Sequence, residues 1–431
     1  MGAVVAAAGA TTSNLTVGNS NTGMLTIQSG GTVSSSCSFP PSCSGGVIGS
    51  AAGSQGRATV TGAGSTWTSN GSLTVGSSGM GTLTIANGGT LSSSSIFPNS
   101  FPGALIGSSA GSQGTVTVTG AGSTWTNTAG LIVGDLGTGT LTIADGGTVR
   151  SGGASVGSLA GSQGTATVTG KGSTWTNNGG FFIGSLSTGT LTIADGGTVS
   201  SSSQSNIGTF DGSQGTVTVT GPGSTWTNNG ALLVGSQGGT STLTIANGGT
   251  VVSESITVAF LSGSIGTLNI GSGPGDPPAA PGTLNAAAVS FFGGTGTINF
   301  NHTAADYVFA PVVSGFGTVN VLAGTTIFTG DNGYFGGTNI SQGATLQLGN
   351  GGMSGSIIGN VADGGTLSFN RSDTVAFPGL ISGTGTVKQI GSGTTILSGA
   401  NTYTGGTTVS DDRRHRQRFW ARLRLARRDR Y

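Results

Sequence analysis

The sequence predicts an all-β solenoid, a parallel β-helix, from three observations. The tetrapeptide Gly-Ser-Thr-Trp returns at intervals of 58, 50 and 51 residues and places four tryptophans at one position of a repeating unit: Trp67, Trp125, Trp175 and Trp226. The motif Leu-Thr-Ile-x-x-Gly-Gly-Thr begins at Leu25, Leu83, Leu141, Leu191 and Leu243. The chain has 87 glycines in 431 residues and only 6% charged residues. Periods of about 50 residues are typical of solenoids and propellers rather than of a single compact core.

Within one unit, short strands alternate with glycine-containing turns. Residues 82–85 and 115–119 place Leu83, Ile85, Val116 and Val118 on one face and threonines on the other, which predicts strands buried on one side only. Glycine and β-branched residues disfavour helix and suit turns and pleated sheets. Disorder is the alternative for a Gly/Ser/Thr-rich chain, but strict alternation of the apolar residues argues against it.

An open solenoid explains the repeats better than a closed propeller does. A propeller needs about four antiparallel strands in each unit and closes after four to eight blades. Here the regular unit runs about four and a half times and then changes into another glycine-rich pattern without stopping. With roughly 22 residues per coil and about 4.8 Å between strands, we expect roughly 18 coils and a rod on the order of 90 Å long.

The repeated tryptophan is interpreted as a column of stacked aromatic rings or a cover over one corner of the coil. A ligand platform, as in carbohydrate binding, is the alternative. The turn position occupied by Asn87 is Asp145, Asp195 and Asn247 in other units. An exchange between Asn and Asp is typical of a turn residue that uses local hydrogen bonds, and a shared catalytic role would not survive it.

Charge and hydropathy exclude two classes of partner. Residues 1–410 carry five basic and ten acidic residues, whereas nine arginines lie in residues 411–431. The body therefore has no basic stripe for nucleic acid. No stretch approaches the ~18 apolar residues of a membrane span. The apolar residues 1–14 are interpreted as a signal-peptide remnant or a clipped terminus.

The two cysteines, Cys37 and Cys43, lie in a loop that is inserted twice. The second copy keeps Phe97-Pro98 in place of Phe39-Pro40 but has no cysteine. A close cysteine pair in an otherwise cysteine-free chain predicts one local disulfide in an exported protein; two free thiols are the alternative. Because they project from the regular coil, the loops are the predicted contact points, at residues Phe39, Pro40, Phe97, Pro98 and Phe101.

No catalytic residue, cofactor or metal site is predicted. Residues 107–111 match Gly-x-Ser-x-Gly, but the neighbouring units have Ala51 and Leu159 at the place of the serine, and residues 1–410 contain a single histidine, His302. A polysaccharide-degrading β-helix enzyme is the alternative. It would need two or three acidic side chains on adjacent coils, and the ten acids here are scattered, with Asp363 in a predicted turn.

The segment 394–409, Thr-Thr-Ile-Leu-Ser-Gly-Ala-Asn-Thr-Tyr-Thr-Gly-Gly-Thr-Thr-Val, closely resembles the autotransporter-associated β-strand repeat of type V secreted passenger domains, and 325–338 is a looser copy. The resemblance covers about 315–410. It implies a right-handed parallel β-helix that is exported, threaded through a C-terminal outer-membrane barrel and displayed as an adhesin or surface antigen. The implied partners are host-cell or matrix surface molecules, or further copies of the chain.

The chain departs from that family at its C-terminus. We expect it to lack the translocator barrel, since the repeat breaks at Ser410 and a barrel needs well over ~100 further residues. The tail is interpreted as a frameshift product, and a basic tail that binds anionic lipid or nucleic acid is the alternative. The chain would then be a truncated passenger, or a non-functional gene product, whose own localisation is open although the intact family is extracellular. The expected segments are 1–14 (apolar), 15–260 (Ser-Thr-Trp solenoid), 261–314 (variable solenoid with a Pro-rich loop), 315–410 (autotransporter repeats) and 411–431 (Arg-rich tail).

Overall fold

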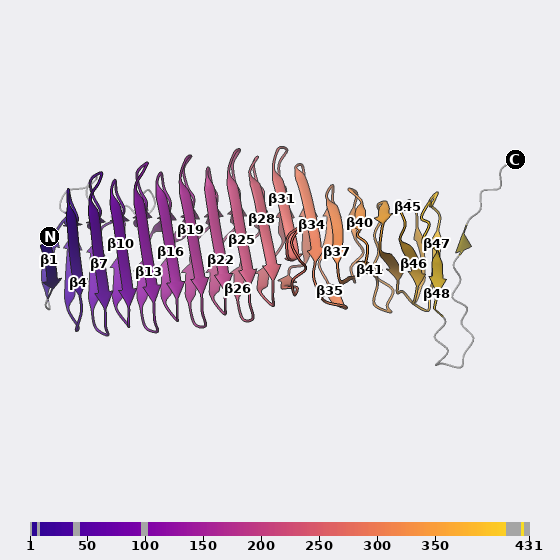
Figure 1. The fold of residues 1–431 in the computed structure, drawn as a ribbon, viewed down its shortest axis with the longest axis horizontal. Helices are drawn as coiled ribbons and strands as arrows, with labels where there is room; N and C mark the ends of the chain where they lie inside the picture. The colour runs from indigo at the N-terminus through magenta and orange to yellow at the C-terminus, as the bar shows by residue number, and fades with distance from the viewer. Residues whose placement is uncertain (1, 7–8, 38–43, 96–101, 411–423, 426–431) are drawn as a thin grey trace.

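Every regular element of the described chain is a β-strand. The computed structural model describes residues 2–6, 9–37, 44–95, 102–410 and 424–425. The strands wind into a rod whose coils follow one another along its length (Figure 1). Among these residues, no helix is present that could span a membrane.

Three long parallel sheets run along the rod, and successive strands of each sheet are three elements apart in the chain over most of its length. Sheet A consists of β1 (Gly2–Ala6), β4 (Thr22–Ile27), β7 (Gln55–Thr61), β10 (Met80–Ala86), β13 (Gln113–Thr119), β16 (Thr138–Ala144), β19 (Gln163–Thr169), β22 (Thr188–Ala194), β25 (Gln214–Thr220), β28 (Thr240–Ala246), β31 (Ile265–Gly271), β34 (Thr295–Asn301), β37 (Thr318–Ala323), β40 (Thr338–Ile340), β42 (Val361–Asp363) and β45 (Ile381–Ser382).

Sheet B consists of β2 (Ala10–Ser13), β5 (Thr32–Ser36), β8 (Thr66–Asn70), β11 (Thr90–Ser93), β14 (Thr124–Asn127), β17 (Thr148–Ser151), β20 (Thr174–Asn177), β23 (Thr198–Ser201), β26 (Thr225–Asn228), β29 (Thr250–Ser253) and β32 (Thr283–Asn285). Sheet C consists of β3 (Leu15–Val17), β6 (Gly46–Ile48), β9 (Leu73–Val75), β12 (Ala104–Ile106), β15 (Gly130–Val133), β18 (Gly153–Val156), β21 (Phe181–Ile183), β24 (Ser205–Ile207), β27 (Leu232–Val234), β30 (Ile256–Val258), β33 (Ala288–Phe291), β36 (Val312–Gly315) and β39 (Gly333–Tyr334).

Two shorter parallel sheets complete the C-terminal coils. One consists of β35 (Tyr307–Phe309), β38 (Thr325–Phe328), β41 (Thr345–Leu348), β43 (Thr366–Phe369), β46 (Thr386–Gln389) and β48 (Thr407–Val409). The other consists of β44 (Thr374–Phe377), β47 (Thr394–Leu397) and β49 (Arg424–Leu425).

One coil is one strand from each of three sheets, so each repeat of about 50 residues forms two coils. The parallel β-helix predicted from the sequence is confirmed. The coils are longer than expected in the first part of the rod, where Thr138 pairs with Gln163, 25 residues on, and shorter near its end, where Val361 pairs with Ile381, 20 residues on. Sheet A accordingly has 16 described strands, close to the expected number of coils.

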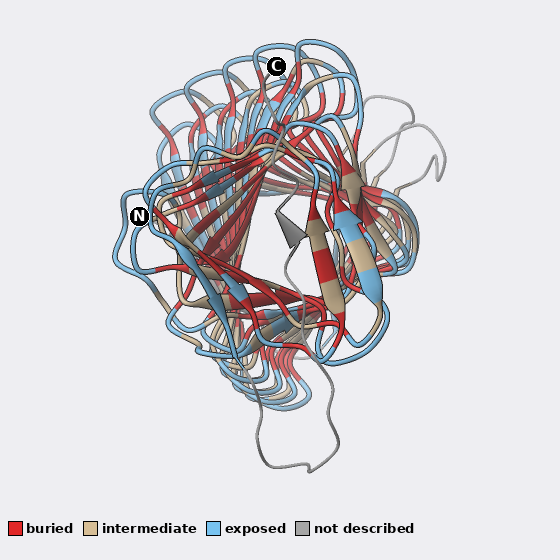
Figure 2. Cartoon of the chain, turned by 90° about the vertical axis from the view of Figure 1, so that its right-hand side faces the viewer, coloured by how far each residue is buried: buried red, intermediate tan, exposed pale blue. Residues whose placement is uncertain are grey.

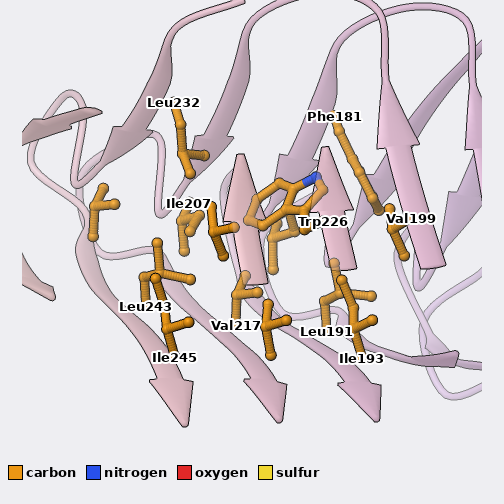
Figure 3. Close-up of a cluster of buried hydrophobic side chains, with 14 of the residues drawn as sticks. Phe181, Leu191, Ile193, Val199, Ile207, Val217, Trp226, Leu232, Leu243 and Ile245 are labelled. Atoms are coloured by element: carbon orange, nitrogen blue, oxygen red, sulfur yellow. The ribbon is translucent and has the colours of Figure 1, made fainter. Parts of the chain in front are cut away.

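The core is a set of apolar ladders inside the coil. Strand β10 buries Leu83 and Ile85, and β13 buries Val116 and Val118, as the alternation predicted. The structure pairs the two strands so that Leu83 lies opposite Val116 and Ile85 opposite Val118. Viewed end-on, buried segments line the inside of the coil and exposed residues gather on the turns (Figure 2). In the middle of the rod, Leu191, Val217 and Leu243 lie in successive strands of sheet A and pack with residues of sheets B and C (Figure 3).

The tryptophans do not form the stacked column that the repeat suggested. Strand pairing in sheet B places Val149 between Trp125 and Trp175, and Val199 between Trp175 and Trp226. The repeat is two coils long, so each ring meets an aliphatic side chain on the next coil and not another tryptophan. All four rings are completely buried, which also rules out the ligand platform.

Candidate functional site

The predicted contact loops cannot be placed. Residues Phe39, Pro40, Cys43, Phe97, Pro98 and Phe101 lie outside the described part of the chain. Cys37 is described, just after β5, where its backbone N–H donates to the carbonyl oxygen of Asn70 at 3.4 Å. The disulfide between Cys37 and Cys43, and the contact role of both loops, therefore stay predictions.

The turn residues have the role that the sequence indicated. Asn87, Asp145, Asp195 and Asn247 all have φ of 51–52°, the left-handed region that Asn and Asp tolerate. Their side-chain bonds reach a threonine on the preceding coil: the Asn87 amide donates to Thr61 at 3.1 Å, and the Asp145 carboxylate accepts from a threonine hydroxyl at 3.1 Å. Because a hydroxyl can donate or accept, Asn and Asp are interchangeable here.

An exposed line of apolar side chains, which the sequence analysis did not identify, follows one corner of the rod. In the turns that lead into sheet A, from sheet C or, for the last residue, from β41, an apolar residue projects outward. These residues, which we call the apolar ridge, are Leu136, Leu159, Leu186, Phe210, Phe260, Leu261, Phe292, Phe316, Phe335 and Ile358. These side chains are 37–74% exposed, and the line is interrupted at Gln237.

The turn geometry explains why the ridge residues point outward. Each of Gly134, Gly157, Gly184 and Gly208 has positive φ and lies two residues before a ridge residue. A Cβ on Gly157 would meet the carbonyl oxygen of Thr188 on the next coil, so only glycine fits there. The signal in the sequence is an apolar residue two places after this glycine, visible only when the turns are aligned coil by coil.

A shallow groove on the outer face of sheet B is the second surface feature. It has a volume of about 370 Å³ and is lined by Arg150, by the hydroxyl-bearing residues Thr174, Thr176, Thr198, Ser200, Thr225 and Thr227, and by Trp175 and Val199. The hydroxyls continue along the sheet, as Thr174 donates to Thr148 at 3.2 Å. One guanidinium among hydroxyls can hold a polar or acidic group at the surface.

The buried ionisable groups do not form a catalytic arrangement. His302 is fully buried among aromatic rings, with its Nε2 2.9 Å from the Thr326 hydroxyl, and burial lowers its pKa to about 4. Asp363 is also fully buried, and burial raises its pKa to about 6. Within the described ranges, no group of three or more His, Cys, Asp or Glu side chains could hold a metal ion.

Asp363 is not the turn residue that the sequence suggested. It ends β42 and lies inside the coil, opposite Ile340 of the preceding coil, while its Oδ1 accepts from the N–H of Gly365 at 3.0 Å. The Asp-Gly-Gly pattern is shared with true turns, but here the strand extends one residue further.

One arginine joins three segments near the C-terminal end of the rod. Arg371 is 7% exposed and donates to both carboxylate oxygens of Asp373, at 2.9 and 2.8 Å, and to Asp331 at 3.2 Å. Its guanidinium also donates to the carbonyl oxygens of Met353 and Gly355. The contacts hold the 349–356 loop against the coil, which is a structural role.

We expect Arg371→Met to lower the free energy of unfolding of the C-terminal coils by about 2 kcal/mol, because it leaves buried carbonyl oxygens and a carboxylate without their donor. Denaturant unfolding measures the loss. Lys388→Met, at an exposed position, is the control and should change stability by less than about 0.5 kcal/mol. Equal effects of the two substitutions would contradict the assigned role.

Comparisons with known proteins agree with the resemblance in the sequence. A family model described as the passenger-associated transport repeat matches residues 323–348 and 387–411. Over 363 residues, 81% of its length, the chain is 33% identical to the adhesin BmaC autotransporter of Brucella suis biovar 1 (strain 1330). The chain spans only 8% of the length of that relative.

A solved structure, a TibC-catalysed hyper-glycosylated fragment of TibA, is also similar. The match covers 94% of this chain and 98% of the fragment, with a TM-score of 0.33 and 17% identity. The autotransporter resemblance, and with it a passenger-type solenoid, is thus confirmed by the repeat family and by the relative in sequence.

Proposed function

We propose that this chain, which has the repeats and the sequence of autotransporter passenger domains, is a section of an adhesive rod without catalytic activity. Passengers of this family are displayed on, or secreted from, the outer membrane of Gram-negative bacteria. The observation that carries the proposal is the alignment to an adhesin over 81% of the chain. Since the chain spans a small part of that adhesin, its receptor is not inherited from the relative.

The structure supports a binding role more than an enzymatic one. The polysaccharide-degrading alternative needs carboxylates that face a substrate on adjacent coils. Asp145 and Asp195 accept hydrogen bonds in turns, Asp363 is buried, and Asp331 and Asp373 bind Arg371. The outer faces instead offer hydroxyl rows, the groove at Arg150 and the apolar ridge.

We propose host-cell or matrix surface molecules as partners, with the inserted loops as the first contact points. Beads coated with the full chain should bind cultured epithelial cells and surfaces coated with matrix proteins. A variant without residues 37–43 and 95–101 should keep its β-sheet circular dichroism and its thermal transition but lose most of this binding. The third unit, where only Gly152 separates β17 from β18, supplies the natural short connection to use in the variant.

The test separates the fold from the function. A matched variant that lengthens the third-unit connection with glycine and serine should bind as the intact chain does. Loss of the thermal transition on deletion would show that the loops are structural, and equal adhesion of the intact and deleted rods would contradict their contact role. Failure of the intact rod to bind any of these surfaces would count against the adhesive function.

A further inference from the structure

We propose that the apolar ridge is a lipid-contact edge, along which the rod lies on an uncharged lipid surface. This inference rests on the proposed adhesive function and names one class of surface that the rod contacts. It differs from the predicted loop contacts, because the ridge lies at another corner of the coil and occupies successive coils rather than two insertions.

On each side of Gln237 the ridge residues are aligned because the turns are held in register by backbone hydrogen bonds. The backbone N–H of Leu159 donates to the carbonyl oxygen of Asp135, that of Leu186 to the carbonyl oxygen of Ser158, and that of Phe210 to the carbonyl oxygen of Ser185, each at 3.0 Å. Within each of the two runs, ridge residues on adjacent coils therefore lie at the strand spacing of about 4.8 Å. From Leu136 to Ile358 the ridge extends for on the order of 45 Å.

Aromatic side chains make one end of the ridge especially apolar. Phe260 and Phe292 pack edge to face with ring centroids 5.6 Å apart, and Phe316 and Phe335 stack at 5.6 Å. Phe316 is the most exposed large apolar side chain of the described chain, at 74%, and Phe335 is 62% exposed. These rings contact each other instead of folding back into the core, so they present their remaining surface to solvent.

The longer run of the ridge, from Phe260 to Ile358, is as large as the largest apolar patch of a typical soluble monomer. Its six side chains are 37–74% exposed and present roughly 450 Å², taking about 150 Å² for each whole side chain. The largest apolar patch of a typical monomer is about 300–600 Å² and is often functional. Isolated exposed apolar residues are common, whereas six along one corner of the coil form a patch.

The shape of the ridge favours a deformable partner. The residues occupy turns at an outer corner of the coil, where exposed residues gather (Figure 2). A convex line one or two side chains wide touches a rigid, flat protein, or a second identical ridge, along little area. An acyl layer closes around it, as it does around the apolar face of an interfacial helix. The ridge consists of Leu, Phe and Ile and has none of the Trp, Tyr and Arg side chains in which protein–protein hot spots are enriched.

The charge of the ridge selects among lipid surfaces. The turns that carry the ridge contain two ionisable residues, Asp135 and Asp211, and no Lys or Arg. Binding to anionic phosphate surfaces needs basic residues. The two carboxylates are compatible with the outward choline groups of a zwitterionic lipid and are repelled by anionic lipid, so the ridge fits a phosphatidylcholine surface.

Flotation with phosphatidylcholine vesicles tests the inference directly. The full chain should float with the vesicles, and the triple variant Leu159→Ser, Leu186→Ser, Phe210→Ser should lower its partition coefficient by at least about tenfold. The control variant Val308→Ser, Met353→Ser, Ile390→Ser removes side chains that are 47, 72 and 37% exposed away from the ridge, and should stay within about twofold of the intact chain. Thermal unfolding confirms that both variants are folded.

A second measurement does not depend on removing the ridge. Phe316→Trp adds an exposed indole to a chain whose repeat tryptophans are buried, and its fluorescence should shift to shorter wavelength with vesicles and be quenched by brominated acyl chains. Replacing part of the phosphatidylcholine with phosphatidylglycerol should weaken binding. Three results would overturn the proposal. They are stronger binding to anionic vesicles than to phosphatidylcholine vesicles, an equal loss of vesicle binding in the two triple variants, and no change in the fluorescence of the tryptophan at position 316 when vesicles are added.

Light scattering tests the other occupant of the ridge. A dimer of the intact chain that dissociates in the ridge variant, together with no vesicle binding, would assign the ridge to a second copy and overturn the lipid contact. The two proposals can fail separately. If the intact chain binds vesicles but not cells, the lipid contact of the ridge is supported and the adhesive function is contradicted. If the ridge variant binds cells as strongly as the intact chain and the intact chain does not bind vesicles, the adhesive function is supported and the lipid contact is contradicted.

Discussion

Replacing Trp125 with alanine is expected to lower the free energy of unfolding of the surrounding coils by about 4 kcal/mol. The ring is completely buried between Leu91 and Val149 of the neighbouring coils, and its indole N–H donates to the Ser93 hydroxyl at 3.0 Å. The substitution leaves a cavity and removes the indole donor, while the Ser93 hydroxyl keeps its hydrogen bond to Asn127. Because coils contact only their neighbours, the loss should be local. Hydrogen exchange should show faster opening of β13–β17, with β43 and β46 unchanged.

A matched pair of tryptophans separates packing from hydrogen bonding. The indole nitrogen of Trp226 has no hydrogen-bond partner among the described residues. The serine at the equivalent position, Ser201, bonds to Ser205 at 3.0 Å in addition to Asn228, whereas Ser93 bonds to Asn127 and to the indole. Trp125→Phe should therefore cost about 1 kcal/mol more than Trp226→Phe. If Trp226→Phe is the more costly of the two, the hydrogen bond to Ser93 contributes nothing measurable.

The strands and their buried faces could be predicted from the sequence because they depend on local patterns. Alternation in residues 82–85 and 115–119 places four apolar residues inward, and the structure pairs them across β10 and β13. Glycine and Asn87-type residues mark the turns because few other residues adopt positive φ at low cost.

The neighbours of the tryptophans could not be predicted in the same way. The repeat gives the position of each ring within a unit, but the ring contacts the other coil of that unit, whose sequence differs. Sheet pairing puts Val149 or Val199 at that place. A stacked column would have required a repeat of one coil.

The candidate surfaces depend on three-dimensional alignment even more strongly. Leu136 and Leu159 look like isolated apolar residues in glycine-rich turns, and only the bonds between coils bring them side by side. The groove near Arg150 likewise combines residues of β17, β20, β23 and β26. The two inserted Phe-Pro loops, by contrast, are easily found in the sequence because they interrupt the repeat.

Asp363→Asn is expected to stabilise the C-terminal coils by about 2–3 kcal/mol at pH 7.5, since a tenfold change in an ionisation equilibrium corresponds to about 1.4 kcal/mol. Burial raises the pKa of Asp363 from 3.8 to about 6. A folded-state pKa above the unfolded value means that the fold prefers the neutral carboxyl. Its stabilising contribution is therefore present below pH 3.8 and is lost as the pH rises through 6. Asparagine keeps the carbonyl-type acceptor for Gly365 and cannot ionise.

The pH profile distinguishes this effect from better packing. The difference between Asp363→Asn and the parent chain should be near zero at about pH 3.5 and grow up to about pH 6.5, as measured by denaturant unfolding of the C-terminal coils. Asp373→Asn is the opposite control: the Arg371 guanidinium holds the pKa of Asp373 below its usual range, so this substitution should destabilise at about pH 7.5 and matter less in acid.

His302 determines how the stability of Asp363→Asn depends on pH. Burial lowers its pKa from 6.5 to about 4, so the fold prefers the neutral ring and loses stability as the pH falls from 6.5 through 4. In the parent chain this loss in acid opposes the gain from Asp363, and stability should change little between about pH 4 and 6.5. In Asp363→Asn the histidine acts alone, and stability should fall steadily with acid over that window. A flat profile in the variant would mean that His302 is not buried as a neutral ring.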